Sequence, residues 1–176
     1  MSILTKNEIM KLVQTKEPLI TNMPDLSTQI QGVGIDLTVN SIEHYSTRGT
    51  IDLYNTKREI SETKIEAPIT IENQLHGYNL KNHGYKIKLN EFLNIPNNIM
   101  GIAHTRSSML RCGAYVESAV FDPGYKGNIE VLLHVVNPNG IRIMQDAKIT
   151  QLVFHKLEND TEPYDGIYQF HKSKKI

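Results

Sequence analysis

The recurrence of apolar side chains at every second position limits what this chain can fold into. Residues 128–136 alternate with a period of two, which is the period of a β-strand and not of a helix. One face of this stretch carries Ile129, Val131, Leu133 and Val135, and the other carries Glu130, Leu132, His134 and Val136. Further strands are predicted at 85–89, 99–104, 141–144 and 148–155. We therefore expect a mainly β fold.

The N-terminal part adds a short amphipathic helix at 5–13, where Thr5 and Glu8 form a capping-box pattern and Pro18 ends the helix. Residues 19–31 are predicted as a loop or weak strand, and residues 32–39 as a strand that carries Asp36. Short irregular strands and long loops are expected between 40 and 75. The polar segment 158–176 is expected to be a flexible tail of one domain spanning 1–176.

Composition narrows the classes of partner. Lys plus Arg and Asp plus Glu both number 19, so the chain has no overall basic field and no nucleic-acid partner is expected. No apolar run approaches the roughly 18 residues that span a bilayer, and no membrane partner is expected. The single cysteine, Cys112, is interpreted as a small buried hydrophobe and fits a reducing compartment. We expect a soluble, cytoplasmic protein.

The candidate chemistry lies between residues 103 and 127. The segment 105–108 reads Thr-Arg-Ser-Ser, which supplies one fixed cation and three hydroxyls suited to phosphate oxygens, although the same segment could cap a helix. Asp122 precedes Pro123 and Gly124, a pair typical of a tight turn. A carboxylate held at such a turn is either a catalytic acid–base group or a simple turn-forming residue.

Four segments, in this order along the chain, resemble the motifs of the trimeric dUTPase and dCTP deaminase superfamily. They are Gly-Ile-Asp-Leu at 34–37, Thr-Arg-Ser-Ser at 105–108, Val-Phe-Asp-Pro-Gly-Tyr-Lys-Gly at 120–127 and Lys-Ile-Thr-Gln-Leu at 148–152. The opening 3–5, Arg111 and the segment 163–169 resemble the deaminase branch, which includes bifunctional and dUTPase-only members. The resemblance implies a distorted jelly-roll β barrel that forms a homotrimer, with nucleotide sites at subunit interfaces.

The resemblance also implies the roles of individual residues. Asp122 would activate the water that attacks the α-phosphorus of dUTP, and Mg²⁺ would bind through phosphate oxygens and water, with no direct protein ligand. Asp36 would order the metal's waters or the phosphate loop, although it could equally be structural. Backbone groups of 113–119 would read the uracil. The implied substrate contacts are Arg106, Ser107, Ser108, Arg111, Tyr125, Gln151, Tyr164 and Gln169.

Leu132 decides between the branches. In deaminases of this family a glutamate ten residues beyond the third-motif aspartate shuttles protons, and here that position is Leu132. Leucine has no proton to exchange, which favours dUTP hydrolysis to dUMP and pyrophosphate over deamination. Two alternatives stay open: a dCTP deaminase or bifunctional enzyme that uses another acid, such as Glu130 or Glu117, and a nucleotide-responsive regulator that binds another protein.

Overall fold

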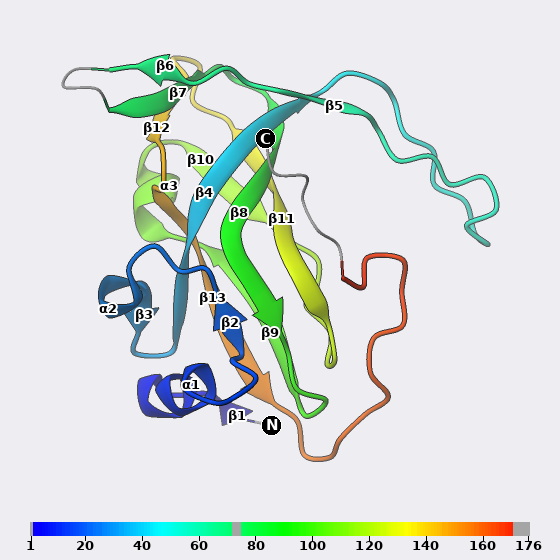
Figure 1. Cartoon of the computed structure of the whole chain (residues 1–176). Coiled ribbons are helices and arrows are strands. Elements are labelled where there is room, and N and C mark those ends of the chain that lie inside the picture. Colours follow the sequence, from blue (N-terminus) through cyan, green and yellow to red (C-terminus); the bar gives the residue numbers. More distant parts are fainter. Residues whose placement is uncertain (1, 72–74, 171–176) are drawn as a thin grey trace.

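The computed structural model describes residues 2–71 and 75–170, and antiparallel strands are its main regular structure (Figure 1). The main sheet runs in the order β1 (Ser2–Ile3), β13 (Lys148–Lys156), β4 (Gly34–Tyr45), β8 (Gly84–Asn94), β11 (Lys126–Val135) and β10 (Ala114–Glu117). Four further strands pair with members of this path: β2 (Ile20–Thr21), β3 (Ile30–Gln31), β5 (Thr63–Ile65) and β9 (Ile99–Thr105).

A smaller sheet and short helices complete the described chain. The second sheet has the order β12 (Ile141–Met144), β7 (His76–Leu80) and β6 (Ile69–Thr70). The helices are α1 (Lys6–Val13), α2 (Leu26–Gln29) and α3 (Ser107–Arg111). Of the helices described, none is long and apolar enough to cross a membrane. The predicted mainly β fold with a short N-terminal helix is confirmed.

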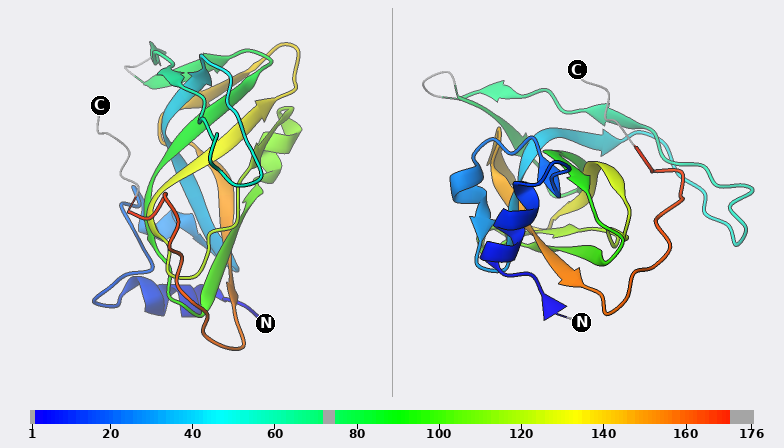
Figure 2. Two further views of the ribbon diagram at one scale, coloured as in Figure 1. Left: turned by 90° about the vertical axis from the view of Figure 1, so that its right-hand side faces the viewer. Right: turned by 60° about the horizontal axis from the view of Figure 1, so that its bottom comes forward.

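The main sheet curls around one apolar core (Figure 2). Strand β13 pairs with β4 on one side and β9 on the other, and Gly101 in β9 then bridges to Phe121, which brings the far edge back toward β11. Along β11 every second side chain is buried, as the alternation of 128–136 predicts. Burial of these aliphatic side chains, at about 1.5–3 kcal/mol each, is the main force that holds the curled sheet.

Several predicted bounds were wrong. Strand β4 continues to Tyr45, because β5 and β8 pair with its second half, and β8 extends well beyond 85–89. The segment 19–31 contains α2, whose start is fixed by the Asp25 carboxylate, which accepts the backbone N–H groups of Ser27 and Thr28. Helix α1, by contrast, ends at Val13 as predicted, and Glu8 accepts from the backbone N–H of Thr5 as the capping pattern predicts.

One local expectation also needed correction. Cys112 is exposed rather than buried, because it lies in the turn that ends α3, next to Gly113 with φ of +75°. The segment 105–108 does start a helix, which is one of the two readings that the sequence left open, because α3 begins at Ser107 directly after Arg106. Both features follow from one short helix that the sequence pattern did not separate from its neighbours.

Residues 46–62 form an arm that projects away from the sheet (Figures 1 and 2). At its base the Ser46 N–H donates to the Glu62 carbonyl, and further out Thr50 and Glu59 exchange two backbone hydrogen bonds. The prediction of irregular strands and long loops for this part of the chain therefore agrees with the structure. The arm is an extended hairpin whose two sides hold each other.

Candidate active site

Asp122 occupies the first position of a tight turn that leads into β11. Pro123 and Gly124 are its central residues, Gly124 has φ of +79°, and the Tyr125 N–H donates to the Asp122 carbonyl at 3.1 Å, which are the features of a type II turn. A side chain at Gly124 would also meet Pro163 at 2.5 Å. The turn thus requires glycine twice over, and it leaves the Asp122 carboxylate exposed.

A cleft of about 490 Å³ opens beside this turn. Its walls come from the turn, β8, β11, the base of the arm and the C-terminal segment. The lining residues are Tyr45, Ile60, Ser61, Lys86, Ala119, Val120, Phe121, Asp122, Tyr125, Asn128, Glu130, Tyr164 and Tyr168. Of the residues predicted from the sequence, Asp122, Tyr125 and Tyr164 therefore meet in one cavity.

Tyr125 forms the inner wall of this cleft. Its hydroxyl donates to the Asn128 carbonyl at 2.7 Å, and its ring meets that of Tyr164 edge to face, with 5.7 Å between ring centroids. Burial, with smaller contributions from Tyr164 and Glu130, raises the pKa of Tyr125 to about 12. The phenol is therefore neutral at physiological pH and offers a fixed, largely apolar surface.

The C-terminal segment is fastened to the turn by Gln169. The Gln169 amide accepts from the Lys126 N–H at 2.8 Å and donates to the carbonyls of Gly124 at 2.9 Å and Tyr164 at 3.1 Å. The Tyr164 N–H in turn donates to the Pro123 carbonyl at 2.8 Å. The amide of Gln169 is thus engaged with backbone, and its effect on the cleft is to hold Tyr164 against Tyr125.

A second hollow of about 350 Å³ shares residues with the cleft. It is lined by Tyr45, Lys86, Glu117, Ser118, Ala119, Glu130, Val131 and Leu132. Leu132 and Glu130 share one face of β11, and the Glu130 carboxylate lies 3.7 Å from the Lys86 ammonium. The Ser118 hydroxyl is buried and has no hydrogen-bond partner within the described part of the chain. The hollow therefore contains the unpaired hydroxyl of Ser118 and the carboxylates of Glu117 and Glu130, whereas Leu132 contributes only apolar surface.

Arg106 belongs to a separate cluster at the start of α3. Its Nε lies 3.2 Å from the Asp36 carboxylate, and its guanidinium also donates to the Lys148 carbonyl at 2.9 Å. Gln151, opposite Asp36 in the β13–β4 register, donates to the same carboxylate at 3.4 Å. Asp36 is only 3% exposed, and burial raises its pKa although Arg106, Lys148 and Gln151 act in the opposite direction.

This second cluster also explains the glycine at position 34. A side chain at Gly34 would lie 2.6 Å from the Leu152 carbonyl oxygen and 3.1 Å from Gln151. Strand β4 therefore needs a residue without a side chain at position 34, so that β13 can approach it at Asp36 and Gln151. Ser107, Ser108 and Arg111 follow Arg106 on α3 and are exposed, so they extend the same surface toward solvent.

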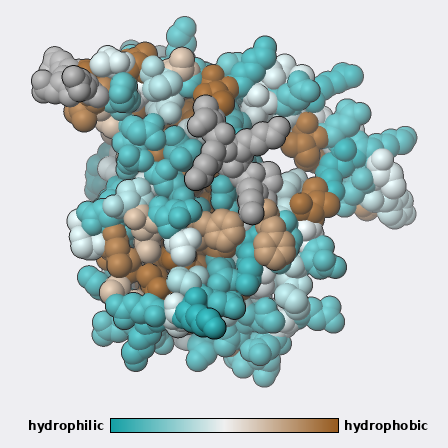
Figure 3. Space-filling model, viewed as in Figure 1, coloured by the Kyte–Doolittle hydropathy of each residue, from teal (hydrophilic) through white to brown (hydrophobic). Residues whose placement is uncertain are grey.

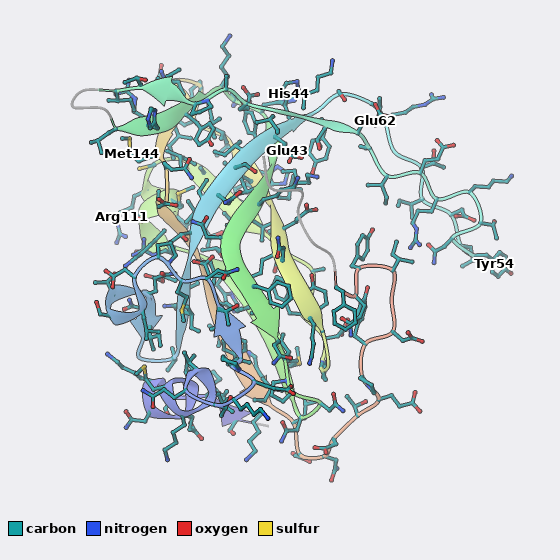
Figure 4. All side chains as sticks on the ribbon, in the orientation of Figure 1. Glu43, His44, Tyr54, Glu62, Arg111 and Met144 are labelled. Carbon is teal, nitrogen blue, oxygen red and sulfur yellow. The ribbon has the colours of Figure 1, made fainter. Side chains whose placement is uncertain are left out.

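The two clusters are far apart in one chain. Phe121 bridges to Gly101 in β9, whereas Arg106 follows the other end of that strand, five residues further along. At about 3.3 Å per residue this separates the Asp122 turn from Arg106 by roughly 17 Å. Figure 4 shows Arg111 on the side of the molecule opposite the arm. One phosphate group cannot contact Asp122 and Arg106 of the same chain.

Comparison with known proteins identifies the family. A family model described as dCTP deaminase-like matches residues 3–157. The chain belongs to the dCTP deaminase-like family. The chain is 39% identical over 171 residues to a Methanosarcina mazei protein named probable deoxyuridine 5'-triphosphate nucleotidohydrolase, covering 96% of this chain and 97% of that protein. A Methanocaldococcus jannaschii protein named deoxyuridine 5'-triphosphate nucleotidohydrolase is 41% identical over 143 residues, covering 80% and 87% respectively.

Solved structures agree on the fold of this family member. A 2'-deoxycytidine 5'-triphosphate deaminase from Agrobacterium tumefaciens matches with a TM-score of 0.62 at 17% identity, covering 88% of this chain and 48% of that chain. At this identity the match supports the fold and not the reaction. Within the dCTP deaminase-like family, the reaction has to be argued from the residues of the cleft.

Several residues of the cleft were missed by sequence reasoning. Tyr45 and Lys86 come from strands β4 and β8, and Ile60 and Ser61 come from the base of the arm. None of them lies in a recognised motif. Alternation could have placed Lys86 on the outer face of β8, but nothing in the sequence shows that this face borders the Asp122 turn.

Proposed function

We propose that this chain is a dUTP diphosphatase that converts dUTP to dUMP and pyrophosphate. The observation that carries the proposal is the Asp122 turn, which presents an exposed carboxylate at the mouth of the cleft, next to the buried Tyr125. The names of relatives at 38–41% identity over most of the chain support it. A cytoplasmic location is part of the proposal, because that is where the nucleotide pool lies.

The proposed reaction is an in-line attack of water on the α-phosphorus. Asp122 accepts a proton from the water as its oxygen bonds to phosphorus, while the bond to the bridging oxygen breaks and its electron pair leaves with pyrophosphate. The proton then passes from Asp122 to solvent. A ring in the position of Tyr125 packs against deoxyribose and leaves no room for a 2′-hydroxyl, which excludes UTP.

Phosphate binding is assigned to Arg106, Ser107, Ser108 and Arg111. Because these residues lie roughly 17 Å from the Asp122 turn in one chain, they reach a triphosphate at that turn only from a second copy. The proposed enzyme therefore has its sites between subunits, where Arg106 stabilises the charge that develops on the leaving pyrophosphate. That the subunits form a homotrimer is part of the proposal and comes from the resemblance to the trimeric family. Gln151 and Asp36 orient Arg106 through the contacts described above.

Magnesium is proposed to enter with the substrate. The part of the chain that the structure describes contains no group of three or more His, Cys, Asp or Glu side chains that could hold a metal ion, and Asp36 is already paired with Arg106. The residues present therefore form no protein cage for the ion. Magnesium commonly binds through substrate phosphates and water, and it would neutralise phosphate charge there.

An assay on three nucleotides tests the proposal. Pyrophosphate release would be followed with dUTP, dCTP and UTP, and ammonia release would be followed in parallel. We expect pyrophosphate from dUTP alone and no ammonia from any of the three. Ammonia from dCTP would instead identify a deaminase that uses Glu130 or Glu117, and nucleotide binding without turnover would identify a regulator.

Leu132 gives a second, sharper test of the reaction type. Leu132→Glu places a carboxyl group in the hollow, where partial burial and the neighbouring carboxylates of Glu117 and Glu130 should raise its pKa toward that of a proton shuttle. We expect at most weak ammonia release from dCTP and about a tenfold rise in KM for dUTP. Leu132→Gln is the neutral control with the same shape. Equal effects of the two substitutions would contradict a role for the charge.

A further inference from the structure

The tip of the arm 46–62 exposes three large apolar side chains. Ile51, Leu53 and Tyr54 are 78%, 84% and 79% exposed, which leaves their apolar surface almost entirely in water. Figure 3 shows a few apolar side chains among mainly hydrophilic ones on the part of the surface that projects to the right, and Figure 4 shows Tyr54 at the far end of the arm. Apolar groups gathered on a projecting element usually mark a contact with another molecule.

The tip has a formed structure and is ready for such a contact. The Asp52 carboxylate accepts the backbone N–H of Thr56 at 3.1 Å, the Thr56 hydroxyl at 3.0 Å and the backbone N–H of Lys57 at 3.2 Å. These bonds close the turn from the inside by means of its polar residues. The apolar side chains of the tip are consequently held pointing outward rather than folded back.

The base of the same arm borders the cleft. Ile60 and Ser61 line it together with Asp122 and Tyr125. In the proposed enzyme a second copy must lie at this cleft, because Arg106 can reach the nucleotide only from another chain. A copy placed there would lie next to the base of the arm. Helix α3 of the same chain lies on the side of the molecule opposite the arm, as the positions of Arg111 and Tyr54 show (Figure 4).

The α3 end of the chain carries a matching apolar surface. Leu110 on α3 and Val136 at the end of β11 are 58% and 55% exposed. They are neighbours, because the Gly113 N–H donates to the Leu110 carbonyl and the Gly113 carbonyl accepts from the Val136 N–H. Cys112 is exposed between them in sequence. We call the surface formed by Leu110, Cys112 and Val136 the α3 face. Because it lies close to Arg106, it would be near the cleft of the other copy when Arg106 contacts the nucleotide there.

We infer that the arm is a clasp whose tip binds the α3 face of a second copy of this chain. The inference rests on the proposed function only for the position of that copy. The clasp would hold the partner's α3, and therefore its Arg106, at the cleft that contains Asp122. The tip of the arm would thus help to complete the active site without contacting the nucleotide itself.

The assembly state tests the clasp without any activity measurement. The double variant Leu53→Asp, Tyr54→Asp changes two exposed side chains, so circular dichroism should show an unchanged fold. Sedimentation should show dissociation at a protein concentration at least about tenfold higher than for the wild type, since charges replace the apolar contact. Leu75→Asp, at a leucine 58% exposed and outside the arm, is the matched control and should assemble normally. Wild-type assembly of the arm variant would overturn the inference.

Crosslinking tests the identity of the surface that the tip meets. In a Tyr54→Cys variant, a short bis-maleimide should link the tip to the native Cys112 of another chain and produce covalent dimers and trimers. The same variant carrying Cys112→Ser should give no linked chains. Linkage that persists without Cys112, or no linkage in either variant, would overturn the docking on α3. Linkage in a protein that fails to hydrolyse dUTP would overturn the proposed function and leave the clasp standing.

Discussion

Strand β4 carries two buried carboxylates seven residues apart, and their surroundings differ. Asp36 and Glu43 are each 3% exposed. Burial raises the pKa of Asp36, and the nearby Arg106, Lys148 and Gln151 only partly offset it. Burial acts in the same direction on Glu43, but hydrogen bonds from Lys88, Thr63 and Lys86 outweigh it and lower the pKa to about 2.

The number of cations in direct contact explains the difference. Glu43 has the Lys88 ammonium at 2.6 Å and the Lys86 ammonium at 3.0 Å, whereas Asp36 is paired directly with one cation of the described chain, Arg106 at 3.2 Å, and Lys148 acts on it without a direct ion pair. A buried charge with little compensation is common where a ligand binds, because the structure there is arranged for the bound state. Asp36 orients Arg106 without saturating it. Glu43 instead fixes the strands beneath the cleft.

Asp122 shows what neither acid of β4 can do, because it alone of the three faces the cleft. We expect Asp122→Asn to lower kcat by at least about a hundredfold, the usual range for losing a general base, with KM changed by less than about threefold. Steady-state kinetics and calorimetry with a non-hydrolysable dUTP analogue would separate the two constants. A comparable loss of affinity would mean that Asp122 holds the turn and not the water.

Arg106→Ala tests Asp36, the buried carboxylate of β4 whose charge is less fully compensated. It removes the proposed phosphate ligand and leaves Asp36 buried without its cation, so kcat/KM should fall by about a hundredfold, or about 2.7 kcal/mol. Thermal unfolding should show a loss of about 1–3 kcal/mol. Adding Asp36→Asn should recover stability but not activity. An unchanged KM would contradict the placement of Arg106 on the phosphates.

Mixing these two inactive variants should restore part of the activity. If each site takes Asp122 from one copy and Arg106 from another, random reassociation of equal amounts leaves about a quarter of the sites with both residues intact. The measurement is dUTP hydrolysis after dissociation and reassembly of the mixture, with each variant treated alone as its control. Activity no higher than the sum of the separate variants would show that one chain supplies both residues.

The smallest effect on the protein is expected at Glu43, whose charge is compensated by two lysines. Because the folded pKa of Glu43 lies below its ordinary value of 4.5, its contribution to stability is present above pH 4.5 and is lost as the pH falls through about 2. Glu43→Gln should therefore cost roughly 3 kcal/mol of unfolding free energy at neutral pH, and the difference from wild type should vanish near pH 2. Urea unfolding across this range would measure it. A constant difference at all pH values would contradict the ion-pair account.

The sequence predicted those parts of the molecule that are determined locally. The alternation at 128–136 predicts the buried face of β11 because one face of that strand packs on the core. Pro123 and Gly124 predict their turn because the φ angles of these two residues are restricted or freed by their own chemistry. The family motifs were found for the same reason, since each is a short continuous segment.

The parts that were missed depend on partners distant in the chain. The pair of Asp36 with Arg106 joins residues 70 positions apart, and the contacts of Gln169 with Gly124 and Lys126 join residues more than 40 apart. No periodicity encodes such pairings. The exposed tip of the arm was also missed, because its apolar residues have the composition of a core strand and only the fold shows that they face water.

The position of β13 bears on how the protein is made. This strand, Lys148–Lys156, is the last strand described, yet it lies between β4 and β9 and supplies the ladder on both sides. During synthesis the edges of both earlier strands therefore stay unpaired until β13 has left the ribosome. Exposed strand edges of this kind invite pairing with other nascent chains. The described sheet is thus completed by β13, and the risk of mispairing is greatest in the interval before that strand emerges.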